Sequence, residues 1–280
     1  MKKISRRSFL AAAGLTVAAL ALTACGGSAS TASSAAASSV AASSEAASTS
    51  TAAAELTTVE AGKLTMATNA TFPPYEMTTD AGTIEGIDVD TAQAIAEKLG
   101  LELQIDDMDF DAALLSVQQG KADIAMAGIT VTDERMAVMS FSDSYATGIQ
   151  SIIVPNDSEI ASPDDLAGKK IGTQRGTTGY IYCSDDFGDE NVVAYDDGLT
   201  AVQALNNGQV DAVVIDNAPA QEFVAANPGL KVLDTSYAEE DYAIGMAKGS
   251  ALEDAVNKAL EELKADGTLQ AIVDKYINAN

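Results

Sequence analysis

The chain contains no histidine, and this absence narrows the chemistry open to it. Histidine is the commonest general base, completes the Ser-His-Asp triad and supplies most zinc sites. A phosphate-binding Walker loop is also missing, since no Gly-Lys-Ser/Thr follows the Gly176-Thr-Thr-Gly179 run. We therefore predict that the protein is not an enzyme and that it holds neither a metal nor a cofactor.

Basic residues are scarce as well. The 16 Lys and Arg stand against 41 Asp and Glu, which gives a formal net charge of −25. Four of the basic residues precede residue 25 and all the acids follow it, so 12 positive charges face 41 negative ones in the rest of the chain. Such a body repels nucleic acid and anionic lipid headgroups, and we expect neither as a partner. Solubility alone explains the charge.

Cysteine is limited to Cys25 and Cys183, and the first 25 residues carry no apolar run long enough for a comfortable membrane span. A basic head followed by the short apolar run 9–24 is typical of an export signal. Leu22-Thr-Ala-Cys25-Gly-Gly resembles the bacterial lipoprotein signal, whose cysteine becomes the first mature residue and carries the lipid. This resemblance implies a lipidated Cys25 at the extracellular face of the bacterial cell membrane, and hence no disulfide to Cys183. Ser5-Arg-Arg-Ser-Phe-Leu10 resembles a twin-arginine motif, so the Sec and twin-arginine routes both stay open.

Residues 26–61 consist largely of Ala, Ser and Thr, with very few large apolar side chains. Such a segment cannot bury enough surface to fold. We predict a disordered tether that holds a folded body close to the membrane.

Apolar runs alternate with helix-like patterns from residue 63 onward. The spacing predicts strands at 64–68, 101–105 and 123–127, and helices at 90–99 and 111–119, the second with Ala112, Leu115 and Ser116 on its buried face. This β-α-β-α-β order predicts an α/β fold with a mainly parallel sheet and right-handed crossovers.

A helix, a glycine, an aspartate and a buried strand then recur in the same order. Gly120 and Asp123 in the first copy correspond to Gly208 and Asp211 in the second, 88 positions later. Two lobes of similar build would explain the recurrence. The alternative is that this arrangement is a common local solution in α/β proteins.

Polar residues follow several of the predicted strands. Asn69, Gly128 and Thr130 come after strands of the first half, and Gln174 and Asp216 after strands of the second. Thr132 is placed to cap a short helix that carries Arg135. Open α/β sheets bind ligands at the carboxyl ends of their strands, so these residues predict a cleft between the lobes. On local pattern alone, Arg135 could also be a surface residue and Asp216 a helix cap.

The predicted cleft complements an α-amino acid zwitterion. Arg135 and the Thr178 N–H at a helix start would hold the carboxylate. Asp216 and Thr130 would hold the ammonium group. Phe72 and Phe110 would supply apolar walls.

Several longer motifs resemble the extracellular, periplasmic-type solute-binding proteins, family 3, of polar amino acid ABC transporters. They are Thr68-Asn-Ala-Thr-Phe-Pro-Pro-Tyr-Glu76, Gly86-Ile-Asp-Val-Asp90, Met108-Asp-Phe110, Ala127-Gly-Ile-Thr-Val-Thr-Asp-Glu-Arg135, Phe141-Ser-Asp143 and Gly176-Thr-Thr178. The resemblance implies a type II fold of two α/β lobes joined by two hinge strands. Lobe 1 would comprise residues 62–147 and 245–280, and lobe 2 residues 148–244.

The same resemblance implies a set of ligand-binding residues: Asn69, Phe72, Glu76, Phe110, Gly128, Thr130, Arg135, Gln174, Thr178 and Asp216. Asn69 departs from the acid often found at its position. Glu76 would take a cationic end of the ligand, or else be a solvated or hinge-facing acid, and Gln174 would suit a polar side chain. We expect a monomer that binds a polar or basic amino acid, with arginine, lysine, glutamine and histidine all open, and delivers it to ABC permease subunits.

Two other functions fit the same scaffold. A tethered sensor would report the amino acid to a membrane receptor, and the sequence does not separate it from a transport protein. A dehydratase acting on a small carboxylate would use Glu76 and Asp216 as acid and base.

Overall fold

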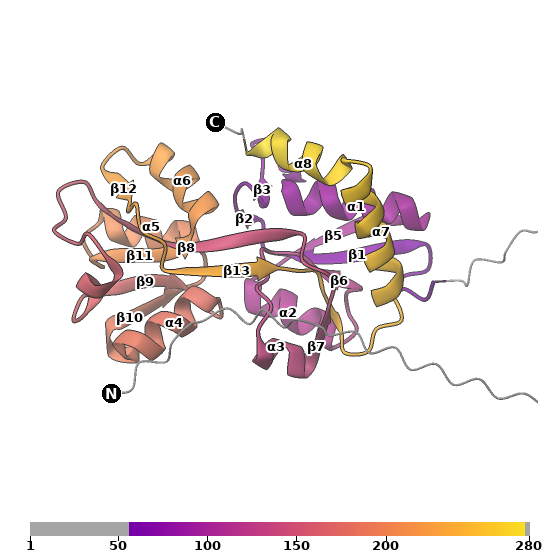
Figure 1. The fold of residues 1–280 in the computed structure, drawn as a ribbon, viewed down its shortest axis with the longest axis horizontal. Helices are drawn as coiled ribbons and strands as arrows, with labels where there is room; N and C mark the ends of the chain where they lie inside the picture. The colour runs from indigo at the N-terminus through magenta and orange to yellow at the C-terminus, as the bar shows by residue number, and fades with distance from the viewer. Residues whose placement is uncertain (1–55, 278–280) are drawn as a thin grey trace, which may run out of the picture. The chain divides into compact units, whose positions relative to one another are not determined.

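The computed structural model describes residues 56–277, which belong to one compact unit of the chain. Cys25, the export signal and most of the Ala/Ser/Thr segment lie outside the described residues. Two sheets, each flanked by helices, build the two lobes (Figure 1).

The first sheet has the strand order β5-β1-β6-β14-β7. Its strands are β1 Lys63–Thr68, β5 Glu102–Asp107, β6 Ile124–Ala125, β7 Met139–Phe141 and β14 Gly245–Ala247. The helices of this lobe are α1 Ile87–Leu99, α2 Phe110–Gln118, α3 Asp133–Val138, α7 Glu253–Ala265 and α8 Thr268–Tyr276. A small hairpin sheet of β2 Thr71–Phe72, β3 Glu76–Thr78 and β4 Ile84–Glu85 precedes α1.

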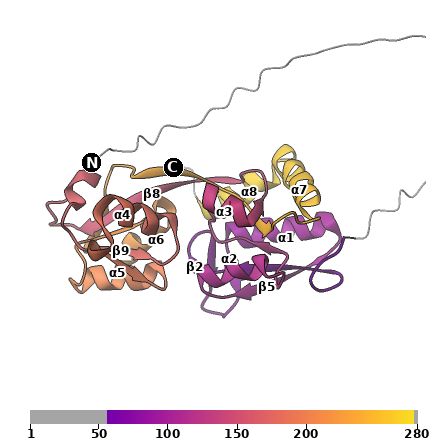
Figure 2. The ribbon, with the colours of Figure 1, turned by 90° about the horizontal axis from the view of Figure 1, so that it is seen from below.

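The second sheet has the order β10-β9-β11-β8-β12, and β13 also pairs with β8. Its strands are β8 Ala146–Pro155, β9 Ile171–Gln174, β10 Val192–Tyr195, β11 Ala212–Asp216, β12 Leu230–Val232 and β13 Ala238–Tyr242. Its helices are α4 Thr178–Phe187, α5 Gly198–Asn206 and α6 Asn217–Ala226, with short 3-10 turns at Pro163–Leu166 and Asp189–Asn191 (Figure 2).

Each sheet is parallel on one side and antiparallel on the other. β1 pairs in parallel with β5 and β6, and β9 with β10 and β11. The antiparallel strands are β7 and β14 in the first sheet, and β8, β12 and β13 in the second. The parallel halves come from the β-α-β units that the sequence predicts.

Both faces of the first sheet are covered. Leu64 and Met66 of β1 pack into the core that contains α1 and α7, whereas Ala67 packs with α2. Successive strand residues face opposite sides, so three neighbouring residues reach both cores. Helix α2 corrects a prediction in part: Ser116 is buried as expected, but Ala112 and Leu115 are exposed, and Ala113, Leu114 and Val117 complete the buried side.

The recurring sequence unit produces the same local structure twice. Gly120 and Gly208 both have φ +66°, a left-handed conformation that ends the preceding helix. Asp123 accepts a hydrogen bond from the Thr65 N–H at 2.8 Å, and Asp211 accepts one from the Lys170 N–H at 2.8 Å. In each lobe the aspartate therefore anchors a neighbouring stretch of backbone.

Two antiparallel strands, β8 and β13, link the lobes (Figure 1). Their register pairs Gln150 with Ala238 and Ala146 with Tyr242. Beyond β13 the chain stays bonded to the first lobe, since the Ala243 N–H donates to the Ile129 carbonyl at 3.1 Å. These strands are the two hinge strands that the family resemblance implies.

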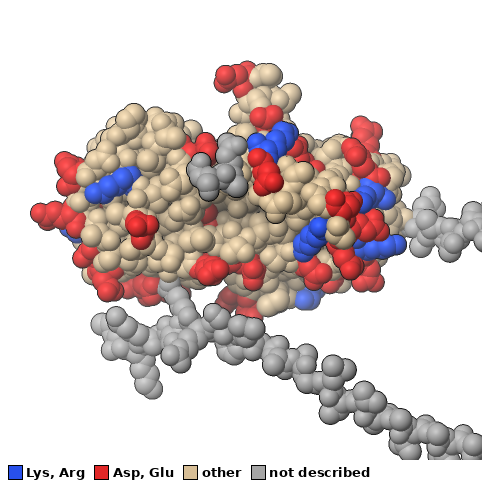
Figure 3. Space-filling model, turned by 45° about the horizontal axis from the view of Figure 1, so that its top comes forward, with Lys and Arg blue, Asp and Glu red and all other residues tan. Residues whose placement is uncertain are grey.

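Acidic side chains are spread over the face shown in Figure 3, with few basic ones between them. None of the helices within residues 56–277 combines the length and the apolar character that crossing a membrane requires. In the same residues, no three acidic or cysteine side chains are grouped so as to hold a metal ion.

Candidate functional site

A pocket lies between the lobes, and all ten predicted ligand-binding residues line it. The first lobe contributes Asn69, Phe72, Glu76, Phe110, Gly128, Thr130 and Arg135. The second contributes Gln174, Thr178 and Asp216, together with Gln150, which the sequence analysis did not single out. The pocket therefore collects residues from loops and strand ends that are up to 147 positions apart, from Asn69 to Asp216.

Arg135 stands at the start of α3, which Thr132 caps by accepting a hydrogen bond from the Arg135 N–H at 3.2 Å. Its guanidinium donates to the Thr130 carbonyl at 2.7 Å and, across the cleft, to the Gly176 carbonyl at 3.1 Å. Its carbon Cζ also lies 5.4 Å from the ring centroid of Phe110. A guanidinium has five N–H donors, so several remain for a carboxylate. Burial lowers the pKa of Arg135, and the charge of Glu240 opposes this shift.

Asp216 lies at the opposite side of the site, at the end of β11. Its carboxylate accepts hydrogen bonds from the Tyr242 hydroxyl and, at 2.9 Å, from Gln150 Nε2. Asp216 occupies the N-cap position of α6, but its side chain makes no capping bond to that helix and is bonded to Tyr242 and Gln150 instead. Burial and then the nearby charge of Glu240 raise the pKa of Asp216 to about 7, although the bonds from Tyr242 and Gln150 lower it.

Two threonines meet across the cleft, and a glycine beside them shapes the wall of the first lobe. The hydroxyls of Thr130 and Thr178 are 3.4 Å apart, across the cleft. Thr178 is the first residue of α4, whose N-terminal N–H groups can face an anion. Gly128 has φ +55°, and a Cβ there would lie 2.6 Å from the Phe72 ring, so the glycine lets this aromatic wall approach.

Asn69 and Gln174 are bonded to each other across the lobes. Gln174 Nε2 donates to Asn69 Oδ1 at 2.8 Å, and Asn69 Nδ2 donates to the Met108 carbonyl at 3.0 Å. The two amides therefore close one end of the pocket with polar groups.

Glu76 is fully buried and lines the pocket, so the solvated alternative is wrong. Burial and the neighbouring carboxylate of Asp88 raise the pKa of Glu76 well above its ordinary value. Burial also raises the pKa of Asp88 to about 6, despite bonds from the Gly128 N–H at 3.0 Å and the Tyr145 hydroxyl at 2.8 Å. Two buried carboxylates this close disfavour each other's ionised form.

A model of the bacterial extracellular solute-binding proteins, family 3, matches residues 64–279. The chain belongs to this family. The predicted family and the two-lobed α/β fold are thereby confirmed.

Three members or structural neighbours illustrate the relationship. The L-cystine-binding protein TcyJ of Escherichia coli K12 is 32% identical over 225 residues, which cover 79% of this chain and 85% of TcyJ. The arginine-, lysine-, histidine-binding protein ArtJ of Geobacillus stearothermophilus superposes with a TM-score of 0.75 at 34% identity, covering 78% and 96% of the two chains. An ancestral arginine-binding protein bound to arginine gives a TM-score of 0.74 at 41% identity, covering 78% and 99%.

These relatives are binding proteins and not enzymes, in agreement with the prediction made for this chain. The dehydratase alternative has no support among them. Their family is extracellular, in line with the predicted side of the membrane.

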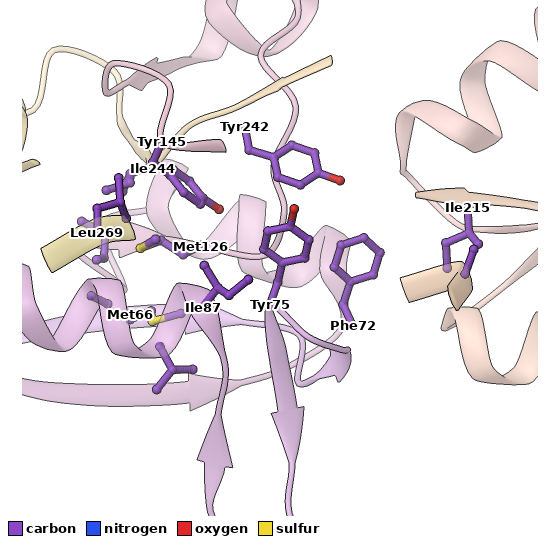
Figure 4. Close-up of a cluster of buried hydrophobic side chains, with 14 of the residues drawn as sticks. Met66, Phe72, Tyr75, Ile87, Met126, Tyr145, Ile215, Tyr242, Ile244 and Leu269 are labelled. Atoms are coloured by element: carbon purple, nitrogen blue, oxygen red, sulfur yellow. The ribbon is translucent and has the colours of Figure 1, made fainter. Parts of the chain in front are cut away.

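Three residues around Asp216 escaped the sequence analysis: Gln150, Glu240 and Tyr242. They lie on the hinge strands and are almost completely buried. Figure 4 shows the Tyr242 hydroxyl pointing toward the lobe that carries Ile215, with Phe72 and Tyr75 beside it. The alternation of buried and exposed residues in β13 could have marked Glu240 and Tyr242, but the acidic run Glu239–Asp241 conceals it.

Proposed function

We propose that the chain is the substrate-binding component of an ABC importer that captures a polar or basic L-amino acid and delivers it to the permease. The observation that carries this proposal is one pocket between two lobes with a guanidinium, Arg135, at one side and a buried carboxylate, Asp216, at the other. These charges match the two charged groups that every α-amino acid carries. Relatives that bind arginine, histidine or cystine support the same ligand class.

In this proposal the ligand carboxylate binds Arg135 and the Thr178 N–H. The ammonium group binds Asp216 and Thr130. Phe72 and Phe110, 7% and 6% exposed, form the apolar walls for the ligand side chain.

The surplus of acid in and around the pocket favours a basic side chain within this class. Glu76 lines the pocket with Asp216, and Glu240 lies directly behind it, whereas Arg135 is the cation that lines it. A second positive charge on the ligand would favour the ionised form of Glu76, because an opposite charge offsets the burial that raises the pKa of this carboxyl. Asn69 and Gln174 add polar groups that arginine, lysine, glutamine or histidine would use.

Capture would proceed by closure about β8 and β13. Bonds that cross the cleft join Gln174 to Asn69 and Arg135 to Gly176. A ligand that contacts both lobes binds the closed form more tightly and shifts the population toward it. We propose 62–147 with 245–280 as one moving lobe and 148–244 as the other.

The test is a thermal-shift screen of the soluble body, from about residue 59, against the common amino acids. A ligand at 100 times its dissociation constant adds about 2.7 kcal/mol to the free energy of unfolding. We expect one or a few amino acids, with arginine and lysine first, to raise the melting temperature. Absence of a shift with every amino acid would contradict the proposed function.

We further propose that the mature chain is a monomeric lipoprotein anchored through Cys25, exported by the Sec or the twin-arginine route. The support is the signal-like sequence before Cys25, which lies outside the described residues. Cys25→Ala should move the protein from the membrane fraction to the soluble fraction, because a lipid chain would no longer hold it. Cys183→Ala is the matched control and should leave the protein in the membrane fraction. An unchanged distribution for Cys25→Ala would argue against the anchor.

A further inference from the structure

Glu240 is an acid that faces inward from a hinge strand. Only 6% of it is exposed, whereas its neighbours in β13, Glu239 and Asp241, are exposed. Its Oε2 accepts hydrogen bonds from the Thr130 hydroxyl at 3.1 Å and from Gln150 Nε2 at 3.0 Å. It therefore contacts two residues that line the pocket without being one of the lining residues itself.

The directions of these bonds follow from the donor atoms available. A carboxylate only accepts, and an amide nitrogen carries two hydrogens. Gln150 gives one hydrogen to Asp216 at 2.9 Å and the other to Glu240 at 3.0 Å. Both hydrogens are thus used, and Gln150 presents only its Oε1, a buried acceptor without a hydrogen-bond partner among the described residues.

The Thr130 hydroxyl is oriented in the same way. It has one hydrogen, which goes to Glu240, so it can only accept from its other partners, among them the Thr178 hydroxyl at 3.4 Å. Asp216 and Thr130 then offer acceptors at the end of the site where the ammonium group would lie, and Gln150 has no hydrogen left to donate there. An ammonium group supplies three donors and no acceptor, so it complements this set.

We propose that Glu240 is a positioning residue that accepts the hydrogens of Thr130 and Gln150. This end of the site then offers the ligand only hydrogen-bond acceptors, so capture depends on the ligand's ammonium group. The inference rests on the proposed amino acid binding. Removing the carboxylate frees the Thr130 hydroxyl to turn its hydrogen toward the ligand. It also frees the Gln150 amide to rotate.

The charge of Glu240 adds a dependence on pH. It is the second cause, after burial, of the raised pKa of Asp216, about 7 in the free protein. The other titratable groups nearby are Tyr75, Glu76 and Asp88 from the hairpin and α1, Tyr145 before β8, Tyr242 on β13 and Arg135 on α3. An ammonium group prefers ionised Asp216, so a proton competes with the ligand below about pH 7. Affinity should therefore fall on acidification, by up to about tenfold per pH unit.

The experiment compares Glu240→Gln with Glu239→Gln by calorimetry. The second variant makes the same chemical change on the exposed side of the same strand. The probes are L-arginine, or the amino acid with the largest thermal shift, and its des-amino analogue, which keeps the carboxylate and lacks the α-ammonium group. Affinities are measured from about pH 5 to about pH 8.5.

We expect the wild type to prefer the amino acid over its des-amino analogue by about a hundredfold or more, since the analogue leaves buried acceptors without donors. Glu240→Gln should reduce this preference about tenfold and move the acidic loss of affinity to lower pH. Glu239→Gln should change neither. Equal preferences and equal pH profiles in the two variants would overturn the inference, whereas failure of every protein to bind any amino acid would overturn the proposed function instead.

A second variant guards against a purely structural effect of the substitution. Thr130→Val keeps the shape of the side chain and removes the hydroxyl that Glu240 orients. If Glu240 acts through Thr130, the two substitutions together should reduce the preference by less than the product of their separate factors. Fully multiplicative effects would contradict that coupling.

Discussion

Arg135→Ala should weaken binding of the amino acid by about 2–5 kcal/mol, or roughly 30-fold to several thousandfold. The loss is large because the ligand carboxylate would remain in a closed site without its charged partner. Burial among Phe110 and the Thr130 and Gly176 carbonyls also strengthens each bond that the guanidinium makes. Calorimetry with the ligand found in the screen measures the loss directly.

The matched control is Arg175→Ala. Arg175 follows the same strand β9 that leads to Gly176, but its side chain is 57% exposed and lies 3.5 Å from Asp196 in a solvent-facing ion pair. Exposed pairs of this kind contribute little, so the control should bind with nearly wild-type affinity. Arg135→Lys should recover only part of the loss, because an ammonium cannot grip a carboxylate through two parallel bonds. Wild-type affinity in Arg135→Ala would remove Arg135 from the site.

Gly86→Ala should destabilise the fold by about 3–4 kcal/mol and lower the melting temperature by roughly 10 °C. Gly86 precedes α1 with φ +143° and ψ 179°, a region open essentially to glycine alone. A Cβ would also lie 2.1 Å from the Tyr75 carbonyl oxygen and 2.9 Å from the Glu76 Cα, and backbone cannot move aside as a side-chain end does. Urea or thermal unfolding measures the change.

Gly82→Ala separates the two causes. Gly82 is in the same hairpin segment and also has a positive φ, +78°, but a Cβ there would meet no atom within 4 Å. We expect a cost of about 1 kcal/mol from the left-handed backbone alone. If Gly86→Ala cost no more than Gly82→Ala, the close approach of the hairpin to the start of α1 would add nothing to the cost of a Cβ at residue 86.

The site residues that could be predicted from the sequence are those that belong to local motifs. Strand ends, the Thr132 cap and the helix start at Thr178 each depend on a few neighbouring residues, and parallel strands place their carboxyl ends together. The ten residues named from these signals and from the family resemblance all line one pocket, although their contacts with a ligand remain predictions.

The buried face of α2 could not be chosen correctly from spacing alone. Residues 112, 115 and 116 share one face of an ideal helix, and residues 113, 114 and 117 share a face rotated from it by about 150°. Of the first set only Ser116 is buried, together with the second set. The second set places Leu114 and Val117 against the small Ala67 and Ala125 of the sheet. Which face of α2 is buried depends on the strands beneath the helix, and the position of these strands is set by the tertiary structure. The start of α1 was also missed: it begins at Ile87, where the Ile87 and Asp88 N–H groups donate to the Pro74 and Tyr75 carbonyls.

The residues around Asp216 were missed for a similar reason. Gln150 and Glu240 lie 66 and 24 positions from Asp216 in the sequence, and only the pairing of β8 with β11 and β13 brings them to it. An acid within the run Glu239–Asp241 looks like any solvated charge until its strand is paired. Long-range register of this kind is not encoded in a short window of sequence.

The strands that flex when the lobes move also carry the side chains that orient the ammonium end of the pocket. A substitution that loosens β13 by removing Glu240 or Tyr242 would therefore alter ligand preference along with mobility. On β13, substitutions at the outward-facing Glu239 and Asp241 are therefore the ones expected to change the rate of opening and closing without changing ligand recognition.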